Sequence, residues 1–320
     1  MAVLHGVRVE SVNHPAASWQ MVRMRTYVTK TMPGILDLLA RHRDGQPLGS
    51  LTVGDLIGRF YTPGWAVHGL PFVRGREASP QGLAPFEEMD PDERAMLARA
   101  LRAQLGRRSL RPADRASIEQ VAAYLERLRR VEKFQLQDWK PSPRGVHAAE
   151  GLQRVLWALE NDLMAGAYVV VTRNDWDTHF LNTARQERAS GMFVPLFARF
   201  LDELSRRRNQ HGTLLDRTTI VVTGELGRYP RLNSDRGKDH FPEVSMLFMG
   251  AGIASGKRGL TLGRTGRDMF GLPMDHATGR IGGKAHVRLD DVGTTLLHLF
   301  GIAPAQYGYG GRVIRPLLAS

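Results

Sequence analysis

Beyond residue 146 the chain alternates between amphipathic helices and short apolar strands. Helical periodicity covers residues 147–166 and 192–208, and almost uninterrupted apolar runs cover 167–172, 218–223 and 244–250. Strands that are apolar at nearly every position are typical of a parallel sheet that is covered on both faces. The pattern therefore predicts an α/β fold with a mostly parallel sheet and helices on both of its faces.

The first 89 residues are less regular, and we assign them to the N-terminal part of the same α/β domain. Residues 3–12 alternate between apolar and polar positions, as a strand does, and residues 32–42 form a short amphipathic pattern that begins at Pro33. Residues 45–85 are rich in Gly and Pro and are predicted to be mostly loop.

A basic helical insertion is predicted over residues 90–145. Its first helix covers 90–105, with Asp90 as the N-cap and Pro91 in the first turn. A second helix is predicted over about 112–134. The basic excess in this insertion is interpreted as a solvated helical face. The rest of the chain, 146–320, is the α/β core described above.

The composition is that of an ordinary globular protein, with 42% hydrophobic and 24% charged residues, which excludes wholesale disorder. The formal charge is +12, from 44 Lys and Arg against 32 Asp and Glu, but 38 of the 44 basic residues are Arg. A coding bias explains such a one-sided excess without a nucleic-acid partner. An Arg-rich nucleic-acid-binding protein is therefore kept only as an alternative.

The chain contains no cysteine, so any metal site must be built from histidine and carboxylate ligands. No apolar run approaches the roughly 18 residues that a membrane span requires, and the first residues lack the pattern of a signal peptide. We therefore expect no membrane span and a cytoplasmic location for the sequence as written. Export is expected instead if an N-terminal segment is missing.

Two clusters of acidic and histidine side chains follow successive strands of the predicted core. Function in α/β sheets gathers where strands reach their carboxyl ends, and oxygen and nitrogen ligands from separate strand ends suit a divalent cation. The candidate metal ligands are Asp175, Asp177, His179, Glu225, Asp239 and His240. The alternative is that Asp177 and His179 only cap and fix their loop.

Four motifs in the same order resemble the alkaline phosphatase and sulfatase superfamily, and within it an uncharacterised sulfatase-like family. They are WDTH at 176–179, TGELGR at 223–228, GKDHFPEVSMLFMGAGI at 237–253 and LDDVGTTLLHLFGI at 289–302. The resemblance spans about residues 146 to 318. Leu226 replaces the usual aromatic residue and Gly224 the usual Ser, and neither change removes a ligand.

This resemblance implies an alkaline phosphatase-like fold and a two-metal hydrolase of small phosphate or sulfate esters. Zinc is the first choice of metal, with manganese and calcium as alternatives. By position, Asp177, His179 and His240 hold one ion, and Glu225 stands where the superfamily places an acid for the second. Asp175 lies four residues before His179, a spacing found in the phosphatases, and so competes with Asp177.

Two further residues carry roles that the resemblance implies. Asp239 is either a ligand or the acceptor that orients a histidine. Arg228 is the candidate catalytic residue, because the planar fork of its guanidinium matches the oxygens of phosphate and sulfate. The alternative for Arg228 is a plain ion pair with Glu225.

The resemblance also implies that the strand with the Ser or Thr nucleophile precedes residue 1, so that this chain lacks it. His14 and Ser18 could line the site, although a loop role is the simpler interpretation of both. We therefore predict a metal-dependent hydrolase of phosphate or sulfate esters that is incomplete at its N-terminus. The alternative is a catalytically inactive relative that acts as a binding or assembly subunit.

Overall fold

This computed structural model describes most of the chain outside the Gly- and Pro-rich segment and part of the insertion. The described residues are 1–29, 32–42, 50–53, 90–106, 111, 115, 118–119, 122, 125, 137–141, 146–162, 164–169, 171, 176–255 and 259–319. The α-helices are α1 (His14–Arg23), α2 (Ile35–His42), α5 (Pro91–Leu105), α7 (Val146–Glu160), α8 (Asn182–Arg206), α9 (Leu214–Arg217) and α10 (Leu289–Leu299). The strands are β1 (Ala2–Arg8), β2 (Ser50–Val53), β3 (Gly166–Val169), β4 (Arg208–Asn209), β5 (Gly212–Thr213), β6 (Thr219–Val222), β7 (Gly227–Arg228), β8 (His240–Phe241), β9 (Glu243–Gly250) and β10 (Leu260–Leu262).

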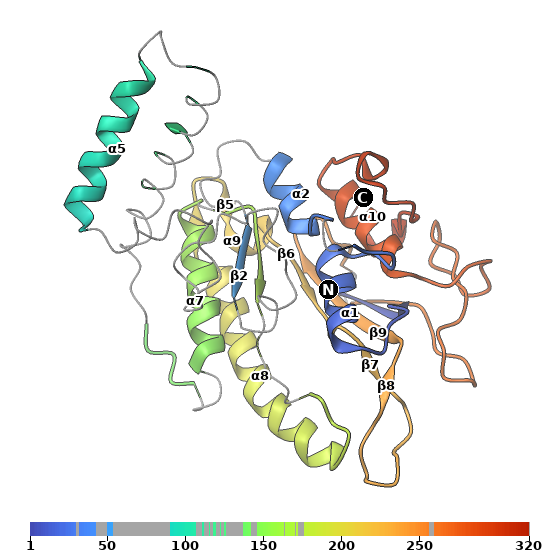
Figure 1. Cartoon of the computed structure of the whole chain (residues 1–320). Helices are drawn as coiled ribbons and strands as arrows, with labels where there is room; N and C mark the ends of the chain where they lie inside the picture. Colours follow the sequence, from blue (N-terminus) through green and yellow to red (C-terminus); the bar gives the residue numbers. More distant parts are fainter. Residues whose placement is uncertain are drawn as a thin grey trace.

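The largest described sheet has four strands in the order β10-β1-β9-β6. Strand β9 runs antiparallel to both of its neighbours, with Met246 opposite Leu4 of β1 and Phe248 opposite Val221 of β6. Strand β10 runs parallel to β1, and β2 pairs with β3 in a separate parallel pair. The β7–β8 pair is antiparallel and projects from the end of the sheet toward the start of α8 (Figure 1).

The mostly parallel sheet with helices on both faces, predicted from the sequence, is therefore wrong. The apolar runs do form the strands β3, β6 and β9, but the fold is a mixed α/β arrangement around a small, mostly antiparallel sheet. An almost uninterrupted apolar run is typical of a strand that is covered on both faces, but it does not fix the direction of the strand. Most residues of β9 are buried, although both neighbouring strands run antiparallel to it.

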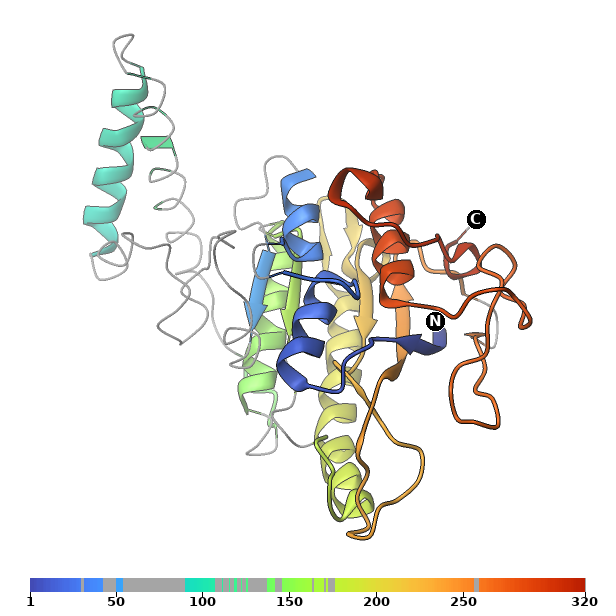
Figure 2. The same ribbon diagram turned by 45° about the vertical axis from the view of Figure 1, so that its right-hand side comes forward.

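Two hydrophobic clusters hold the described elements in place. In the first, α1, α2 and α10 pack with the central sheet around fully buried side chains such as Leu4, Leu38 and Phe248. In the second, α7, α8 and α9 pack around Leu156 and Leu204. Figure 2 shows α1, α2 and α10, in blue and red, on the side of the sheet away from α7 and α8. The beginnings of α1 and α8 are thereby fixed relative to the strands between them.

Several helices agree with the sequence. Helix α5 begins as predicted, because the Asp90 side chain accepts a hydrogen bond from the Asp92 backbone N–H at 2.8 Å and Pro91 occupies the first turn. Helix α1 was not expected, since His14 and Ser18 were interpreted as loop residues. The second predicted helix of the insertion, 112–134, lies mostly outside the described residues.

Within the described residues, none of the helices is both long enough and apolar enough to cross a membrane, as the sequence predicted.

Candidate metal centre

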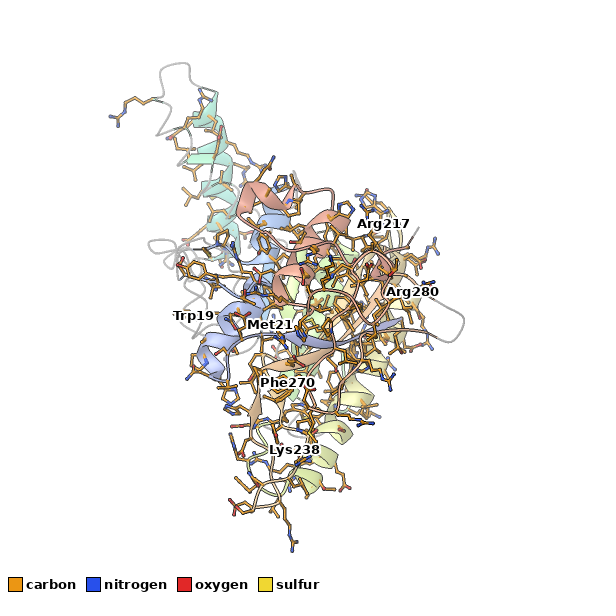
Figure 3. All side chains as sticks on the ribbon, turned by 90° about the vertical axis from the view of Figure 1, so that its right-hand side faces the viewer. Trp19, Met21, Arg217, Lys238, Phe270 and Arg280 are labelled. Atoms are coloured by element: carbon orange, nitrogen blue, oxygen red, sulfur yellow. The ribbon has the colours of Figure 1, made fainter. Side chains whose placement is uncertain are left out.

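Four segments that are far apart in the sequence meet beside the start of α1. They are the β1–α1 connection, the segment before α8, the turn that follows β6, and the β7–β8 hairpin. Figure 1 shows β7 and β8 between α1 and α8, and Lys238, labelled in Figure 3, marks the loop of this hairpin. Each segment contributes at least one polar side chain or carbonyl to a single cluster.

One carboxylate oxygen lies at the centre of this cluster. The Nε2 atoms of three histidines surround Asp177 Oδ1, at 3.5 Å for His14, 3.2 Å for His179 and 3.6 Å for His240. The Nε2 atoms of His179 and His240 are 2.9 Å apart. The donor atoms of His14, Asp177 and His240 all lie within 4.8 Å of one another, and His179 adjoins this group through Asp177 and His240.

The other ring nitrogen of each histidine is held by an oxygen atom. The Nδ1 atom of His14 lies 2.6 Å from Glu225 Oε1, that of His240 lies 2.5 Å from the carbonyl oxygen of Val12, and that of His179 lies 3.4 Å from Asp239 Oδ1. Carbonyls and carboxylates only accept, so each Nδ1 carries the proton and donates. The Nε2 lone pairs are then left free to face the common centre, which is the arrangement of metal-binding histidines.

Two features of these Nε2 atoms call for a positive charge between them. With both Nδ1 atoms protonated, the lone pairs of His179 and His240 face each other across 2.9 Å and repel. The Nε2 atom of His14 is buried, and no hydrogen bond reaches it from any part of the chain that the structure describes. A cation bound by His14, Asp177 and His240 would satisfy the buried Nε2 atom of His14 and remove the repulsion between His179 and His240.

Arg228 is the second partner of the Asp177 carboxylate. Its Nη2 donates a short hydrogen bond to Asp177 Oδ1, and its Nη1 donates to the carbonyl oxygen of Lys238 at 3.2 Å. Burial of Asp177 raises its pKa, but the hydrogen bond from the Arg228 guanidinium and its positive charge outweigh that effect. The pKa of Asp177 therefore lies below its ordinary value, and the carboxylate stays ionised.

The loop of the β7–β8 hairpin is fastened to the backbone of His179 by Asn233. The Nδ2 group of Asn233 donates to the carbonyl of His179 and to Asp239 Oδ1, both at 3.1 Å. Its Oδ1 accepts from the backbone N–H of Gly237 at 2.8 Å and from that of Asp235 at 3.1 Å. The Nδ2 group therefore holds His179 and Asp239 together, while Oδ1 fixes the backbone of the loop.

The structure places the predicted site residues in two groups. Asp177, His179 and His240 meet at the centre, and Arg228 contacts Asp177 rather than Glu225. Glu225 and Asp239 lie against histidine Nδ1 atoms, as an orienting acceptor would. Asp175 lies outside the described residues. As metal ligands, all of these residues stay predictions.

His14 was considered as a lining residue in the sequence and was not included among the ligands. It is the first residue of α1, which Asn13 caps by accepting from the Ala16 N–H at 3.3 Å. Its donor atom lies within 4.8 Å of those of Asp177 and His240. The signal that could have found it is the one used for the other clusters, because His14 also follows the carboxyl end of a strand.

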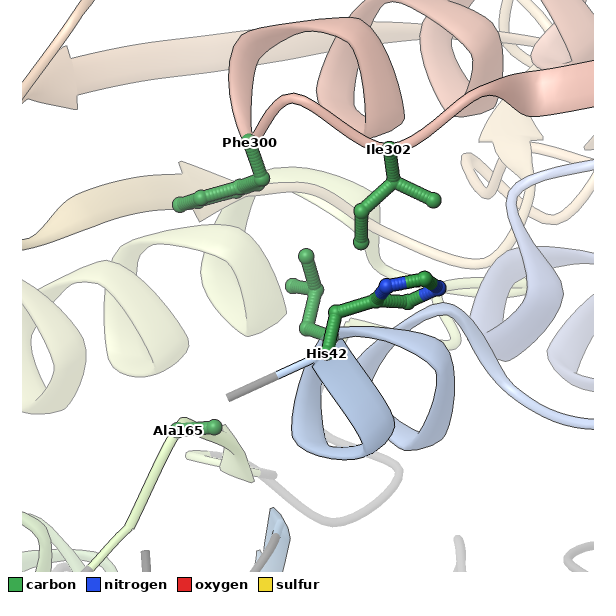
Figure 4. Close-up of a pocket in the computed structure, with 5 residues that line it drawn as sticks. His42, Ala165, Phe300 and Ile302 are labelled. Atoms are coloured by element: carbon green, nitrogen blue, oxygen red, sulfur yellow. The ribbon is translucent and has the colours of Figure 1, made fainter. Parts of the chain in front are cut away.

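A pocket lies elsewhere, between α2 and the end of α10. Its lining residues are Leu39, His42, Ala165, Phe300 and Ile302 (Figure 4). The pocket shares no residue with the histidine cluster, so the two features are separate.

Residues 58–316, and so most of the chain, match the model of a known protein family. The matching family is described as Protein of unknown function (DUF1501). The chain belongs to the DUF1501 family. The DUF1501 match includes Asp177, His179, Arg228 and His240, whereas His14 precedes it. No curated protein matches the chain.

The DUF1501 match corrects the resemblance to the alkaline phosphatase and sulfatase superfamily. DUF1501 is a distinct family, and neither comparison links the chain to that superfamily or to its sulfatase-like family. The four motifs are short, and clusters of Asp and His after strand ends recur on unrelated folds. The expectation of a missing nucleophile strand before residue 1 depended on the resemblance and is withdrawn with it.

Proposed function

We propose that this protein binds a divalent cation at His14, Asp177, His179 and His240 and uses it to hydrolyse a small anionic ester. The observation that carries the proposal is the convergence of three imidazole Nε2 atoms on Asp177 Oδ1, at 3.2 to 3.6 Å. An exposed acidic residue beside a histidine is common on protein surfaces. Three histidines with a shared target and separately fixed Nδ1 atoms are not.

The donor set favours zinc. Zinc bonds to nitrogen and oxygen are about 2.0–2.2 Å long, which puts tetrahedral ligand atoms about 3.3–3.5 Å apart. The separations from Asp177 Oδ1 bracket this value. The donor atoms of His14, Asp177 and His240 already lie within 4.8 Å of one another, whereas His179 must shift to join them and its 2.9 Å separation from His240 must lengthen. Calcium and magnesium prefer sites made of oxygen ligands, so a site with three imidazoles suits them poorly.

The chemistry that such an ion supplies suits the hydrolysis of an ester whose phosphate or sulfate group carries negative charge. A bound divalent cation lowers the pKa of a water molecule toward 7 and stabilises charge on the oxygens of the reacting group. Arg228 contributes a guanidinium at the same place, whose two parallel N–H bonds match a phosphate or sulfate. Hydrolysis breaks the bond from phosphorus or sulfur to the ester oxygen, and water supplies the hydroxyl and the proton.

Zinc binding and ester hydrolysis by the purified chain test this proposal. We expect one equivalent of zinc to bind, and the double variant His179→Ala/His240→Ala to bind at least about 100-fold more weakly, because it loses two ligands. The control is His211→Ala, which removes an exposed histidine far from the cluster. Hydrolysis of p-nitrophenyl phosphate or p-nitrophenyl sulfate should require zinc and disappear in the double variant.

The two measurements have separate consequences. Equal zinc affinity in the wild type and the double variant would overturn the site assignment. Zinc binding without hydrolysis of either ester would overturn the catalytic part alone and favour a binding or assembly subunit.

A further inference from the structure

Arg228 and the proposed cation compete for one atom. The Nη2 of Arg228 donates to Asp177 Oδ1, which is the oxygen that the three Nε2 atoms surround. A guanidinium and a divalent cation on the same oxygen repel each other, and the ion carries twice the charge. A cation that binds Asp177 therefore weakens the hold of this carboxylate on Arg228.

The guanidinium cannot leave the site when this contact weakens. The Arg228 side chain is only 14% exposed, and its Nη1 remains hydrogen-bonded to the carbonyl of Lys238. Arg228 also lies directly opposite His240 in the β7–β8 pair, so both side chains project from the same face of the hairpin. A released Arg228 thus stays beside the cation without a carboxylate partner.

A part-buried guanidinium without a counter-ion is costly, and a tetrahedral oxyanion removes that cost. Without the cation, the same oxyanion would approach the carboxylates of Asp177 and Glu225, which repel it. Before the cation binds, the site therefore has low affinity for an anion. After the cation binds, the N–H donors of the Arg228 guanidinium are available to it.

We propose that Arg228 makes cation binding and oxyanion binding at this centre cooperative. The cation takes Asp177 Oδ1, and the guanidinium that it displaces binds the phosphate or sulfate group of the substrate. This inference rests on the proposed function, because it needs a cation at the histidine cluster. It adds an order of binding to that function, because the metal-free protein has low affinity for the substrate and the cation must bind first.

Linkage requires the effect to be reciprocal, so the anion must tighten cation binding by the same factor as the cation tightens anion binding. Couplings between sites commonly lie at about 5- to 150-fold. Since the two ligands here share one arginine and one carboxylate, we expect about tenfold or more.

The experiment measures the zinc affinity of the full chain in a chelator-buffered titration, with inorganic sulfate or with chloride at equal ionic strength. For the wild type we expect sulfate to tighten zinc binding by about tenfold. In Arg228→Gln the zinc affinity without sulfate should equal or exceed that of the wild type, and the effect of sulfate should vanish. Arg231→Gln is the matched control, because it removes an exposed charge from the same hairpin loop and should keep the full effect.

Arg228→Lys is the second variant and keeps the charge without the fork, so we expect a smaller effect of sulfate than in the wild type. Zinc binding that is indifferent to sulfate in the wild type would overturn the coupling while leaving the metal centre intact. An undiminished effect in Arg228→Gln would also overturn it, since sulfate would then be contacting the ion without Arg228. Absence of zinc binding in the wild type would instead overturn the proposed function itself.

Discussion

Each histidine of the centre divides its two nitrogens between different tasks. Nδ1 donates to an oxygen of the surrounding chain, and Nε2 faces Asp177. The sequence indicates which residue types gather, because acids and histidines follow strand ends. It does not indicate which atom faces which, so Glu225 was expected as a ligand and Asp239 as either a ligand or an orienting acceptor. Both carboxylates lie against histidine Nδ1 atoms. That distinction depends on side-chain positions that only the assembled fold defines.

Replacement of Glu225 distinguishes whether this residue orients His14 or is itself a metal ligand. If it orients His14 through Nδ1, Glu225→Ala should weaken zinc binding by about 10- to 100-fold, the usual effect of losing such an acceptor. The measurement is the same zinc titration, with Asp216→Asn as an exposed acidic control. A loss as large as that of His179→Ala/His240→Ala would show instead that Glu225 is itself a ligand.

The β7–β8 hairpin is the element on which the centre depends most. It carries Arg228 and His240 directly, and Asn233 ties its loop to His179. The apolar runs that form β6 and β9 could be predicted because burial leaves a pattern in the sequence. The two-residue strands of this hairpin could not, since they are too short for any period and are fixed by hydrogen bonds with distant segments.

Gly237 tests how closely this loop must approach the segment before α8. A Cβ atom at Gly237 would lie 1.8 Å from the carbonyl oxygen of His179, and both groups are backbone, so Gly237→Ala must push the loop away. We expect a loss of about 1–3 kcal/mol in stability, measured by urea unfolding, together with weaker zinc binding.

Gly191→Ala is the control for this change, because a Cβ there meets nothing within 4 Å and lies inside α8. It should stabilise the protein by about 0.5–1 kcal/mol. If Gly237→Ala left both stability and zinc affinity unchanged, the hairpin would not be held against His179 in the way described.

For the whole molecule, the fold class was the least predictable property. Local patterns located most of the helices and strands, but the direction of each strand is set by which elements pack together across long distances in the chain. Asp291 is an example of a residue that holds together segments from different parts of the chain. Its carboxylate lies 3.0 Å from His276 Nε2 and accepts from the backbone N–H groups of Arg288 and Arg312, at 2.8 and 2.7 Å. It thereby joins α10 to the segments on either side of it.

The pH dependence of stability should report this buried carboxylate. Burial raises the pKa of Asp291, but the nearby His276 imidazole and the hydrogen bonds from the backbone N–H groups of Arg312 and Arg288 lower it by more, so its pKa in the folded state lies below the ordinary 3.8. The stabilisation is thus present above pH 3.8 and is lost as the pH falls through the lower, folded-state value. Asp291→Asn should cost about 1.5–3 kcal/mol at pH 7 and progressively less below pH 3.8.

Urea unfolding of the wild type and Asp291→Asn at a series of pH values measures this difference, with Asp216→Asn as the exposed control. A difference that stayed constant from neutral to strongly acidic pH would contradict the assignment, because it would then not depend on ionisation of Asp291.

The contact between His240 and the carbonyl of Val12 joins residues that are 228 positions apart. During synthesis, at about 5–20 residues per second, roughly 10–45 s separate the appearance of these two residues. A nascent chain presents His14 first, then Asp177 and His179, and completes the set only when β8 has been made. Metal loading should therefore be a late event in the life of the chain, and a loaded centre would mark a molecule whose synthesis has passed β8.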